Sequence, residues 1–416
     1  MSAQQYGGAT RRFAWSIVVL LWFAYLLNYI DRQVVFSIFP VLRSELHFTN
    51  AQLGLVGTIF TWVYSVCMLV TGRLADTVRR DRLVLGSIVL WSLATLGTGL
   101  AASAGSFLLW RAVMGITESL YVPAALATIA VLHPGGTRSR ALALHGSAQF
   151  AGIIAGGWYG GWTADRIGWR PGMGTLAIAG TVYALVLWKF FRGAATQPRV
   201  EARVRSTPVE IFHSRCYCAM IVAFFSFCTM LWMLYAWFPN FIYERYHLSM
   251  AQSGLAATLY LQTSCIAGIL AGGVIADWLV RRVRSGRFWL ASAGLAASAP
   301  FAYLSLSAGS LVVAESASGG FGFFAGLFIA NVFAGSYDVI SARNYGFATG
   351  MLNLVGCVAG GAAILAAGVW KQSVGMEDMM KWQAVASACA AGLLLLVAAT
   401  QFGSDRRMLG AAEQTS

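Results

Sequence analysis

Residues Phe13–Pro40 read FAWSIVVLLWFAYLLNYIDRQVVFSIFP, an apolar run that contains one adjacent acidic and basic pair, Asp31 and Arg32. A helix needs about 20 apolar residues to cross the hydrocarbon core of a bilayer. The run exceeds that length and is too long for the apolar core of a signal peptide. We therefore expect it to remain in the protein as a transmembrane helix.

Similar runs recur along the whole chain. Of its 416 residues, 58% are hydrophobic and only 11% are charged, whereas soluble proteins carry about 25% charged residues. The composition predicts an all-α membrane protein with twelve transmembrane helices. We expect them at Phe13–Pro40, Leu53–Leu74, Leu83–Ser103, Phe107–Leu132, Ala141–Trp162, Trp169–Phe191, Cys216–Tyr243, Ala251–Ile275, Phe288–Ser307, Leu311–Tyr337, Tyr345–Trp370 and Trp382–Phe402.

The basic residues gather in alternate connecting segments, and the net charge is +13. Cytoplasmic loops of membrane proteins keep positive charge, so the pattern places both termini in the cytoplasm. Topology explains the charge, and no nucleic-acid partner is expected.

The two halves of the sequence repeat each other with an offset near 200 residues. The matching segments are Phe39-Pro40 with Phe238-Pro239, His47 with His247, Ala51-Gln52 with Ala251-Gln252, and Gly72–Asp76 with Gly273–Asp277. An even number of helices separates the copies, which is typical of parallel repeats in transporters. We expect a six-helix bundle at 1–191, a cytoplasmic linker at 192–215 and a second six-helix bundle at 216–416.

Four ionisable residues fall inside the apolar runs: Asp31, Arg32, Arg111 and Glu118. Each charge costs about 2.5–3.5 kcal/mol at the bilayer centre, so we expect the four to face one another or water. Arginine offers a planar fork to a carboxylate, and a buried carboxylate beside an arginine can load and release a proton. The spacing indicates a shared anion and proton site. The alternative is a structural ion pair that fixes helix packing.

Three motifs stand out: Asn28-Tyr-Ile-Asp-Arg32, Gly72–Arg82 with Asp76, and Arg111-x3-Gly115-x2-Glu118-x4-Pro123. Together they resemble the major facilitator superfamily, specifically its anion:cation symporter branch, which includes carriers of galactonate and hexuronates. The resemblance covers the whole chain. It implies the major facilitator fold of two pseudo-symmetric bundles, and a proton-coupled symporter of a small organic anion that works by alternating access in a bacterial inner membrane.

The same resemblance implies roles for individual residues. Asp31 and Glu118 would be protonation sites, Arg32 would bind the substrate carboxylate, and Arg111 would pair with Glu118 or the substrate. Further substrate contacts are implied for Tyr29, Tyr64, Gln149 and Asn353. A cytoplasmic gate is implied for Gly72, Asp76, Arg79, Arg80 and Asp277. The partners implied are the organic anion and membrane lipids, with the proton as coupling ion, no other cofactor, no metal and a monomeric chain.

Other classes of function fit the sequence less well. An enzyme would need a motif such as HExxH, GxSxG or a phosphate-binding loop, and the sequence has none of them. A channel would need a filter loop or rings of like charge. The nearest rival is a spinster-type carrier of lysolipids, since that family has similar motifs in helices 1 and 4.

Two histidines remain. We expect His133, which precedes Pro134-Gly-Gly, to lie in a solvated loop. His145 lies four residues before Gln149 on one helix face and could border the transport cavity.

Overall fold

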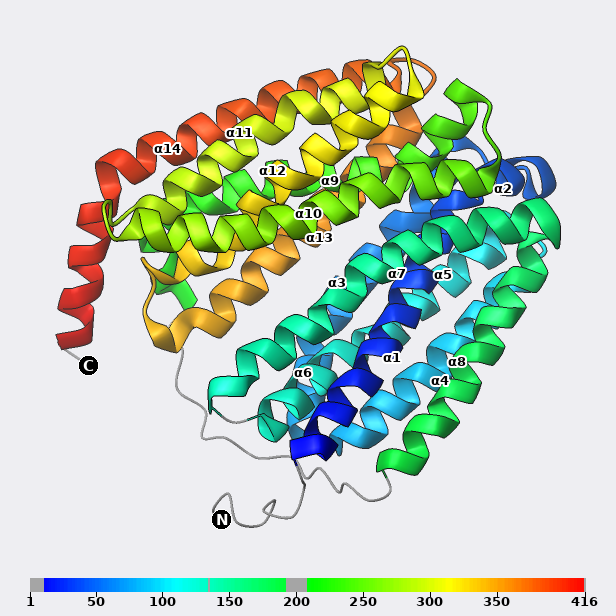
Figure 1. Ribbon diagram of the computed structural model, residues 1–416, viewed down its shortest axis with the longest axis horizontal. Helices are drawn as coiled ribbons and strands as arrows, with labels where there is room; N and C mark the ends of the chain where they lie inside the picture. Colours follow the sequence, from blue (N-terminus) through cyan, green and yellow to red (C-terminus); the bar gives the residue numbers. More distant parts are fainter. Residues whose placement is uncertain (1–10, 134, 192–207, 415–416) are drawn as a thin grey trace. The chain divides into compact units, whose positions relative to one another are not determined.

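The computed structural model describes residues 11–133, 135–191 and 208–414 (Figure 1). These residues form helices and short connections, with no strand among them. The predicted all-α fold is therefore confirmed. Contacts divide the chain into unit 1 (Met1–Phe48, Ile59–Glu201 and Ser249–Leu255) and unit 2 (Thr49–Thr58, Ala202–Leu248 and Ala256–Ser416).

The helices of unit 1 come mainly from the first half of the sequence. They are α1 (Arg11–Ser37), α2 (Phe39–Leu46), α3 (Asn50–Thr77), α4 (Arg80–Gly99), α5 (Ala104–Ser119), α6 (Tyr121–Leu132), η2 (Gly135–Thr137), α7 (Arg138–Arg166) and α8 (Trp169–Phe191). The first turns of α3 belong to unit 2. Within unit 1, α1 lies along α7 and α4 lies along α8 (Figure 1).

The helices of unit 2 come mainly from the second half. They are η3 (Pro208–His213), α9 (Arg215–Tyr246), α10 (Met250–Val280), α11 (Gly286–Ser307), α12 (Leu311–Tyr337), η4 (Ala342–Asn344), α13 (Tyr345–Trp370) and α14 (Met376–Gln414). The first turns of α10 belong to unit 1. Residues 192–207 of the expected linker lie outside the described residues, so the boundaries at 192 and 215 stay predictions.

Eleven helical stretches among the described residues are long and apolar enough to cross a membrane. The expected twelfth, Ala141–Trp162, corresponds to α7. This helix has 29 residues, a length of about 43 Å at 1.5 Å per residue, so it is long enough to span. Its glycines and polar residues lower its hydropathy, and its glycine face packs against α1: a Cβ at Gly156 would lie 2.8 Å from the carbonyl oxygen of Ile30.

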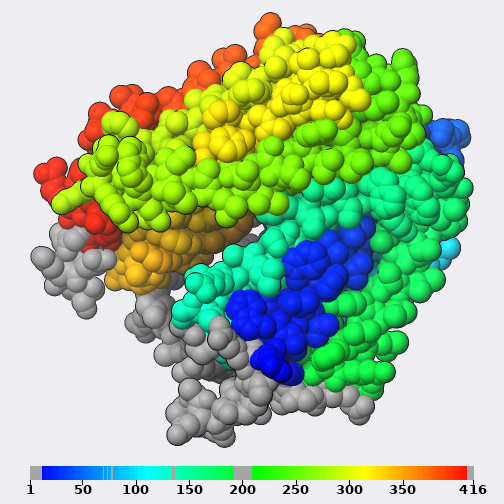
Figure 2. All heavy atoms as spheres, viewed as in Figure 1, coloured from blue at the N-terminus to red at the C-terminus, as the bar shows by residue number. Residues whose placement is uncertain are grey.

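Large apolar side chains also lie on the outside of the helices. On α1, Val19 and Phe23 are 44% and 46% exposed, and the helix forms a blue patch on the surface of unit 1 in Figure 2. Lipid would cover such side chains at no cost. The exposure therefore agrees with a membrane location.

Two expected helices are each divided in two. The first, Phe13–Pro40, ends as α1 at Ser37, and Pro40 lies in the first turn of α2. The fourth, Phe107–Leu132, is divided at Leu120 into α5 and α6. In both places a proline follows the break, and proline lacks the N–H that a continuous helix requires.

Candidate functional site

The four predicted intramembrane charges lie together inside unit 1. Asp31 and Arg32 come from the last turns of α1, and Arg111 and Glu118 lie two turns apart on α5. Arg111 and Glu118 are fully buried, whereas Asp31 and Arg32 are 5% and 9% exposed. The helices therefore remove two acids and two bases from both lipid and bulk water.

Arg32 and Glu118 form the ion pair of this cluster. The Arg32 Nε donates to Glu118 Oε2 at 2.7 Å, the short distance expected of a charge-assisted hydrogen bond. Three buried atoms beside this bond have no hydrogen-bond partner among the described residues: Glu118 Oε1, Arg32 Nη2 and Asp31 Oδ1. The cluster therefore contains one donor and two acceptor atoms that can hydrogen-bond to a proton donor, a water molecule or a substrate.

Aromatic rings cover the faces of the Arg32 guanidinium. Its central carbon lies 4.4 Å from the ring centroid of Tyr64, 4.9 Å from Tyr29 and 5.0 Å from Phe60. A guanidinium is attracted to ring faces at such distances. The sequence predicted Tyr29 and Tyr64 at the site but missed Phe60, which carries no polar group to mark it.

Arg111 also packs on the Phe60 ring, 4.7 Å from its centroid, and its Nη1 donates to Met114 Sδ at 2.9 Å. It lies within electrostatic range of Glu118 and Asp31. The resemblance implied Glu118 or the substrate as the partner of Arg111, whereas the direct ion pair with Glu118 is made by Arg32.

Gly115 lies between Arg111 and Glu118 on α5. A Cβ there would lie 2.9 Å from the Phe60 carbonyl oxygen and 3.1 Å from the Tyr64 nitrogen. The missing side chain therefore lets α3 approach α5, which brings the rings of α3 against the charges.

The other two predicted substrate residues, Gln149 and Asn353, take no part in these contacts. Gln149 is half-buried on α7. Asn353 belongs to unit 2, where it is exposed on α13 and its Nδ2 donates to the Thr349 carbonyl oxygen at 2.9 Å. Their role in substrate binding stays a prediction.

The predicted gate residues of unit 1 lie at the end of α3 and the start of α4. A Cβ at Gly72 would meet nothing within 4 Å, and the side chain of Asp76 lies outside the described residues. Arg79 donates two hydrogen bonds to Asp81, at 2.7 and 3.1 Å, and this bonding raises the pKa of Arg79. Arg80 is buried, at 6% exposure. The sequence had not singled out Asp81 as the partner.

The matching segment of unit 2 also pairs with an arginine. Asp277 lies 3.8 Å from Arg287, and its side chain is 74% exposed. Arg287 makes a closer pair with Asp338, donating to both carboxylate oxygens at 2.8 and 2.9 Å. Arg406 adds a hydrogen bond to the carbonyl oxygen of Asp338. Asp338 therefore accepts hydrogen bonds from both arginines at this end of unit 2.

One prediction about a histidine is wrong. His133 is not solvated: it is 3% exposed, its ring lies edge-on against Trp15 at 4.7 Å, and its Nδ1 contacts the Thr137 hydroxyl at 3.2 Å. The ring of Trp15 covers His133 and shields it from solvent.

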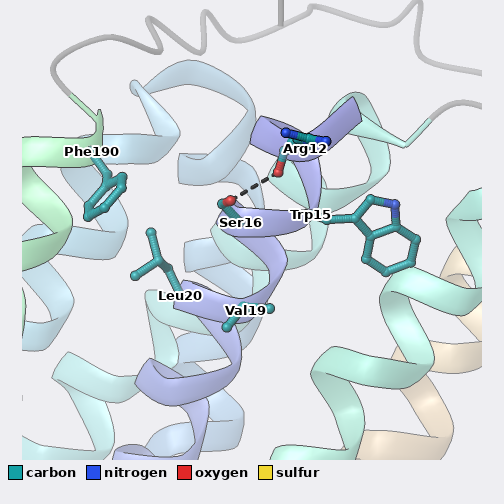
Figure 3. A pocket seen from close by; sticks show the side chains of 6 residues that line it. All are labelled: Arg12, Trp15, Ser16, Val19, Leu20 and Phe190. Carbon is teal, nitrogen blue, oxygen red and sulfur yellow. Dashed lines mark hydrogen bonds between the residues drawn. The ribbon is translucent and has the colours of Figure 1, made fainter. Parts of the chain in front are cut away.

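A pocket of about 820 Å³ lies elsewhere in unit 1, between α1 and the end of α8 (Figure 3). It is lined by Arg12, Trp15, Ser16, Val19, Leu20 and Phe190. None of the predicted site residues lines it. The side chains labelled in Figure 3 come from the first turns of α1 and the last turn of α8. It is therefore separate from the charged cluster.

The described residues contain no group of three or more His, Cys, Asp or Glu side chains that could hold a metal ion.

Comparison with known proteins identifies the family. The model of the Major Facilitator Superfamily matches residues 21–364. The chain belongs to this superfamily. Its members are membrane transporters and not enzymes, and the many long apolar helices of this chain make it a multi-pass membrane protein.

Relatives within the superfamily include carriers of anions and sugar acids. A probable chloroplastic anion transporter of Oryza sativa subsp. japonica is 31% identical over 64% of this chain and 48% of its own length. A probable L-galactonate transporter of Escherichia coli K12 is 25% identical over 65% of this chain and 63% of its own length. The chain thus spans about half to two thirds of these relatives.

A solved structure confirms the major facilitator fold. The crystal structure of a bacterial homologue of the human lysosomal transporter Spinster, in an inward-facing and unoccupied conformation, has a TM-score of 0.77. The structural match extends over 95% of this chain and 98% of the homologue's chain, and the two sequences are 19% identical. At that identity the likeness concerns the fold alone.

Proposed function

We propose that this major facilitator protein is a proton-coupled symporter of a small organic anion, such as a sugar acid or another carboxylate. Arg32 binds the substrate carboxylate, Glu118 and Asp31 take up the coupling proton, and Arg111 balances their charge. Transport follows alternating access, and the proton is the only coupling species.

The observation that supports this proposal is the buried Arg32–Glu118 pair, whose 2.7 Å bond leaves Glu118 Oε1 and Arg32 Nη2 without partners among the described residues. Substrate carboxylate and Glu118 would compete for one guanidinium. A proton on Glu118 removes that competition, so anion and proton binding favour each other. A net buried charge is costly, and a carboxylate entering together with a proton adds none.

The relatives guide the choice of substrate. Their names refer to anions and L-galactonate, and a sugar acid combines one carboxylate with several hydroxyl groups. Side chains that can hydrogen-bond to hydroxyl groups suit such a molecule. We propose that Tyr29, Tyr64, Gln149 and Asn353 make these hydrogen bonds to the substrate. We further propose that the protein acts as a monomer in a bacterial inner membrane, with both termini in the cytoplasm.

Uptake into proteoliposomes tests it. The purified chain is reconstituted, and uptake of labelled L-galactonate, a hexuronate, an aromatic acid and a dicarboxylate is compared with and without an inwardly directed proton gradient. We expect at least one acid to accumulate only with the gradient. Glu118→Gln should abolish that accumulation while keeping exchange of substrate across the membrane at equal pH.

The matched control is Glu315→Gln, which removes a half-buried carboxylate of α12 in unit 2. It should leave gradient-driven uptake unchanged. Gradient-driven accumulation by Glu118→Gln at the wild-type level would refute the coupling role. Transport of lysolipids alone, with no organic acid taken up, would instead favour the spinster-type alternative.

A further inference from the structure

Next to the charged cluster, unit 1 contains a packed group of rings that the mechanism above does not use. Tyr25 of α1, Tyr121 of α6 and His145 of α7 meet there. The Tyr25 and His145 rings are stacked, with centroids 4.6 Å apart and planes 14° apart. Tyr121 also stacks on Tyr25, at 5.8 Å. His145 and Tyr121 are 1% and 0% exposed.

The hydrogen bonds of Tyr121 determine which atom of His145 carries a proton. The Tyr121 hydroxyl donates its single proton to the Leu21 carbonyl oxygen at 2.6 Å, and it also lies 3.2 Å from His145 Nε2. A hydroxyl has one proton to donate and two lone pairs. The bond to Nε2 therefore requires the hydroxyl oxygen to accept, and His145 Nε2 must be the donor.

This ring group is connected to the Arg32 site by two steps along α1. The Tyr25 ring lies edge-on against Tyr29, with centroids 4.9 Å apart at 87°, and the Tyr25 hydroxyl donates to the Tyr29 hydroxyl at 3.5 Å. The Tyr29 ring in turn lies 4.9 Å from the Arg32 guanidinium. Contacts therefore run without a break from Tyr25 through Tyr29 to Arg32.

We propose that His145 is a positioning residue for anion binding: through its stack on Tyr25 and its Nε2–H bond to Tyr121, it holds Tyr29 against Arg32. His145 does not touch the substrate. This inference rests on the proposed function, in which Arg32 binds the substrate carboxylate. It adds α6 and α7 to the two helices that carry the charges.

Two substitutions separate the hydrogen bond from the ring. His145→Phe keeps an aromatic ring for Tyr25 but loses the Nε2 donor, whereas His145→Gln places an amide N–H near the Nε2 position. A hydrogen bond contributes about 0.5–1.5 kcal/mol, which corresponds to roughly two- to twelvefold in an equilibrium constant. We expect His145→Phe to raise the KM for L-galactonate, or for the best acid of the panel, by about that factor.

The maximal rate should change less than twofold, and His145→Gln should recover most of the affinity. A residue needed only for packing would not show this split between KM and rate, nor rescue by Gln. His133→Phe is the matched control, because His133 is another buried histidine of unit 1 that packs on Trp15. It should leave KM unchanged. An unaltered KM in His145→Phe would overturn the inference while the proposed function stands.

A second measurement applies if the wild type transports no organic acid, in which case the proposed function fails. Thermal unfolding of His145→Phe, Tyr121→Phe and the double variant forms a cycle that reports their coupling without any substrate. We expect the double variant to lose less stability than the sum of the single variants. Additive losses would overturn the inferred bond between His145 and Tyr121.

Discussion

Arg32 is held in three ways at once: Glu118 accepts its Nε proton at 2.7 Å, and Tyr64 and Phe60 cover its faces at 4.4 and 5.0 Å. A guanidinium fixed in this manner loses little further freedom when it binds a carboxylate. Its Nη2, which has no partner among the described residues, is then the atom that can donate to a new acceptor at least cost.

The Arg32–Glu118 pair makes the first prediction. Arg32→Met fills the space among the rings but leaves the Glu118 carboxylate buried without its cation, and breaking a buried pair costs about 3–5 kcal/mol. We expect the melting temperature in detergent to fall by several degrees. The double variant Arg32→Met/Glu118→Gln should recover most of the loss, because no unpaired charge remains.

Arg12→Met on the same helix is the control, since Arg12 is exposed and its replacement should leave the melting temperature unchanged. If Arg32→Met unfolds at the wild-type temperature, the pair does not contribute to stability in the way described.

At this scale the sequence predicted which charges meet but not how they pair. Periodicity places Asp31 and Arg32 on one helix and Arg111 and Glu118 on another, and the cost of buried charge requires them to approach. The choice between the two arginines depends on a rotation of α5 against α1 that sequence does not encode locally. The sequence singled out His145 beside the cavity, but its bond to Tyr121 was hidden for the same reason, because that bond joins two helices.

Among the helices, the break between α5 and α6 has a specific cause. Pro123 cannot donate to the carbonyl of Ser119, four residues earlier. The Thr71 hydroxyl of α3 donates to that carbonyl oxygen instead, at 2.9 Å. The motif containing Pro123 was recognised in the sequence, but the break at Leu120 was missed because apolar character continues through it.

Thr71 supplies the second prediction. Thr71→Val keeps the size of the side chain but leaves the Ser119 carbonyl without this donor, and an unsatisfied buried acceptor costs about 1–3 kcal/mol. We expect a lower melting temperature for Thr71→Val and a value near wild type for Thr71→Ser, which keeps the hydroxyl. Equal melting temperatures for the two variants would show that the hydroxyl contributes nothing.

Gly152, Gly156 and Gly160 are spaced four residues apart on α7, and the face that they form packs closely on α1. Added Cβ atoms would lie 2.8, 2.8 and 2.7 Å from carbonyl oxygens of α1. Backbone oxygens cannot move aside as side chains do. The same glycines explain why α7 is less apolar than the other long helices while it packs so closely on α1.

Two glycines of this helix give the third prediction. Gly156→Ala forces α1 and α7 apart, and overpacking of this kind costs about 1–3 kcal/mol. Gly146→Ala on the same helix meets nothing within 4 Å and gains about 1 kcal/mol of helix propensity. Thermal unfolding should therefore show shifts of opposite sign. A stabilised Gly156→Ala variant would contradict the close packing of the two helices.

The internal repeat extends over the whole molecule, and its two copies share hydrogen bonds as well as amino acids. Thr49 and Gln52 exchange hydrogen bonds at the start of α3, and Ser249 and Gln252 do the same at the start of α10. Both are capping boxes. The repeat is not exact, however: α1 ends before Pro40, whereas α9 continues through Pro239.

The repeated histidines share a backbone conformation that the sequence alone did not reveal. His47 ends α2 with φ 53°, and His247 ends α9 with φ 55°. They are the two non-glycine residues with positive φ among the described residues. The left-handed conformation costs about 1–2 kcal/mol for a residue with a Cβ, and both halves of the chain accept that cost at the same position.

The fourth prediction follows from this symmetry. Both histidines are exposed, so His47→Gly and His247→Gly should each relieve backbone strain and raise the free energy of unfolding by roughly 1 kcal/mol. His47→Ala and His247→Ala remove the ring but keep the Cβ, and should bring no such gain. Melting temperatures of the four variants separate the effect of the backbone from that of the side chain. If glycine stabilised one position and destabilised the other, the two turns would differ in strain, and the repeat would be one of sequence without a shared conformational cost.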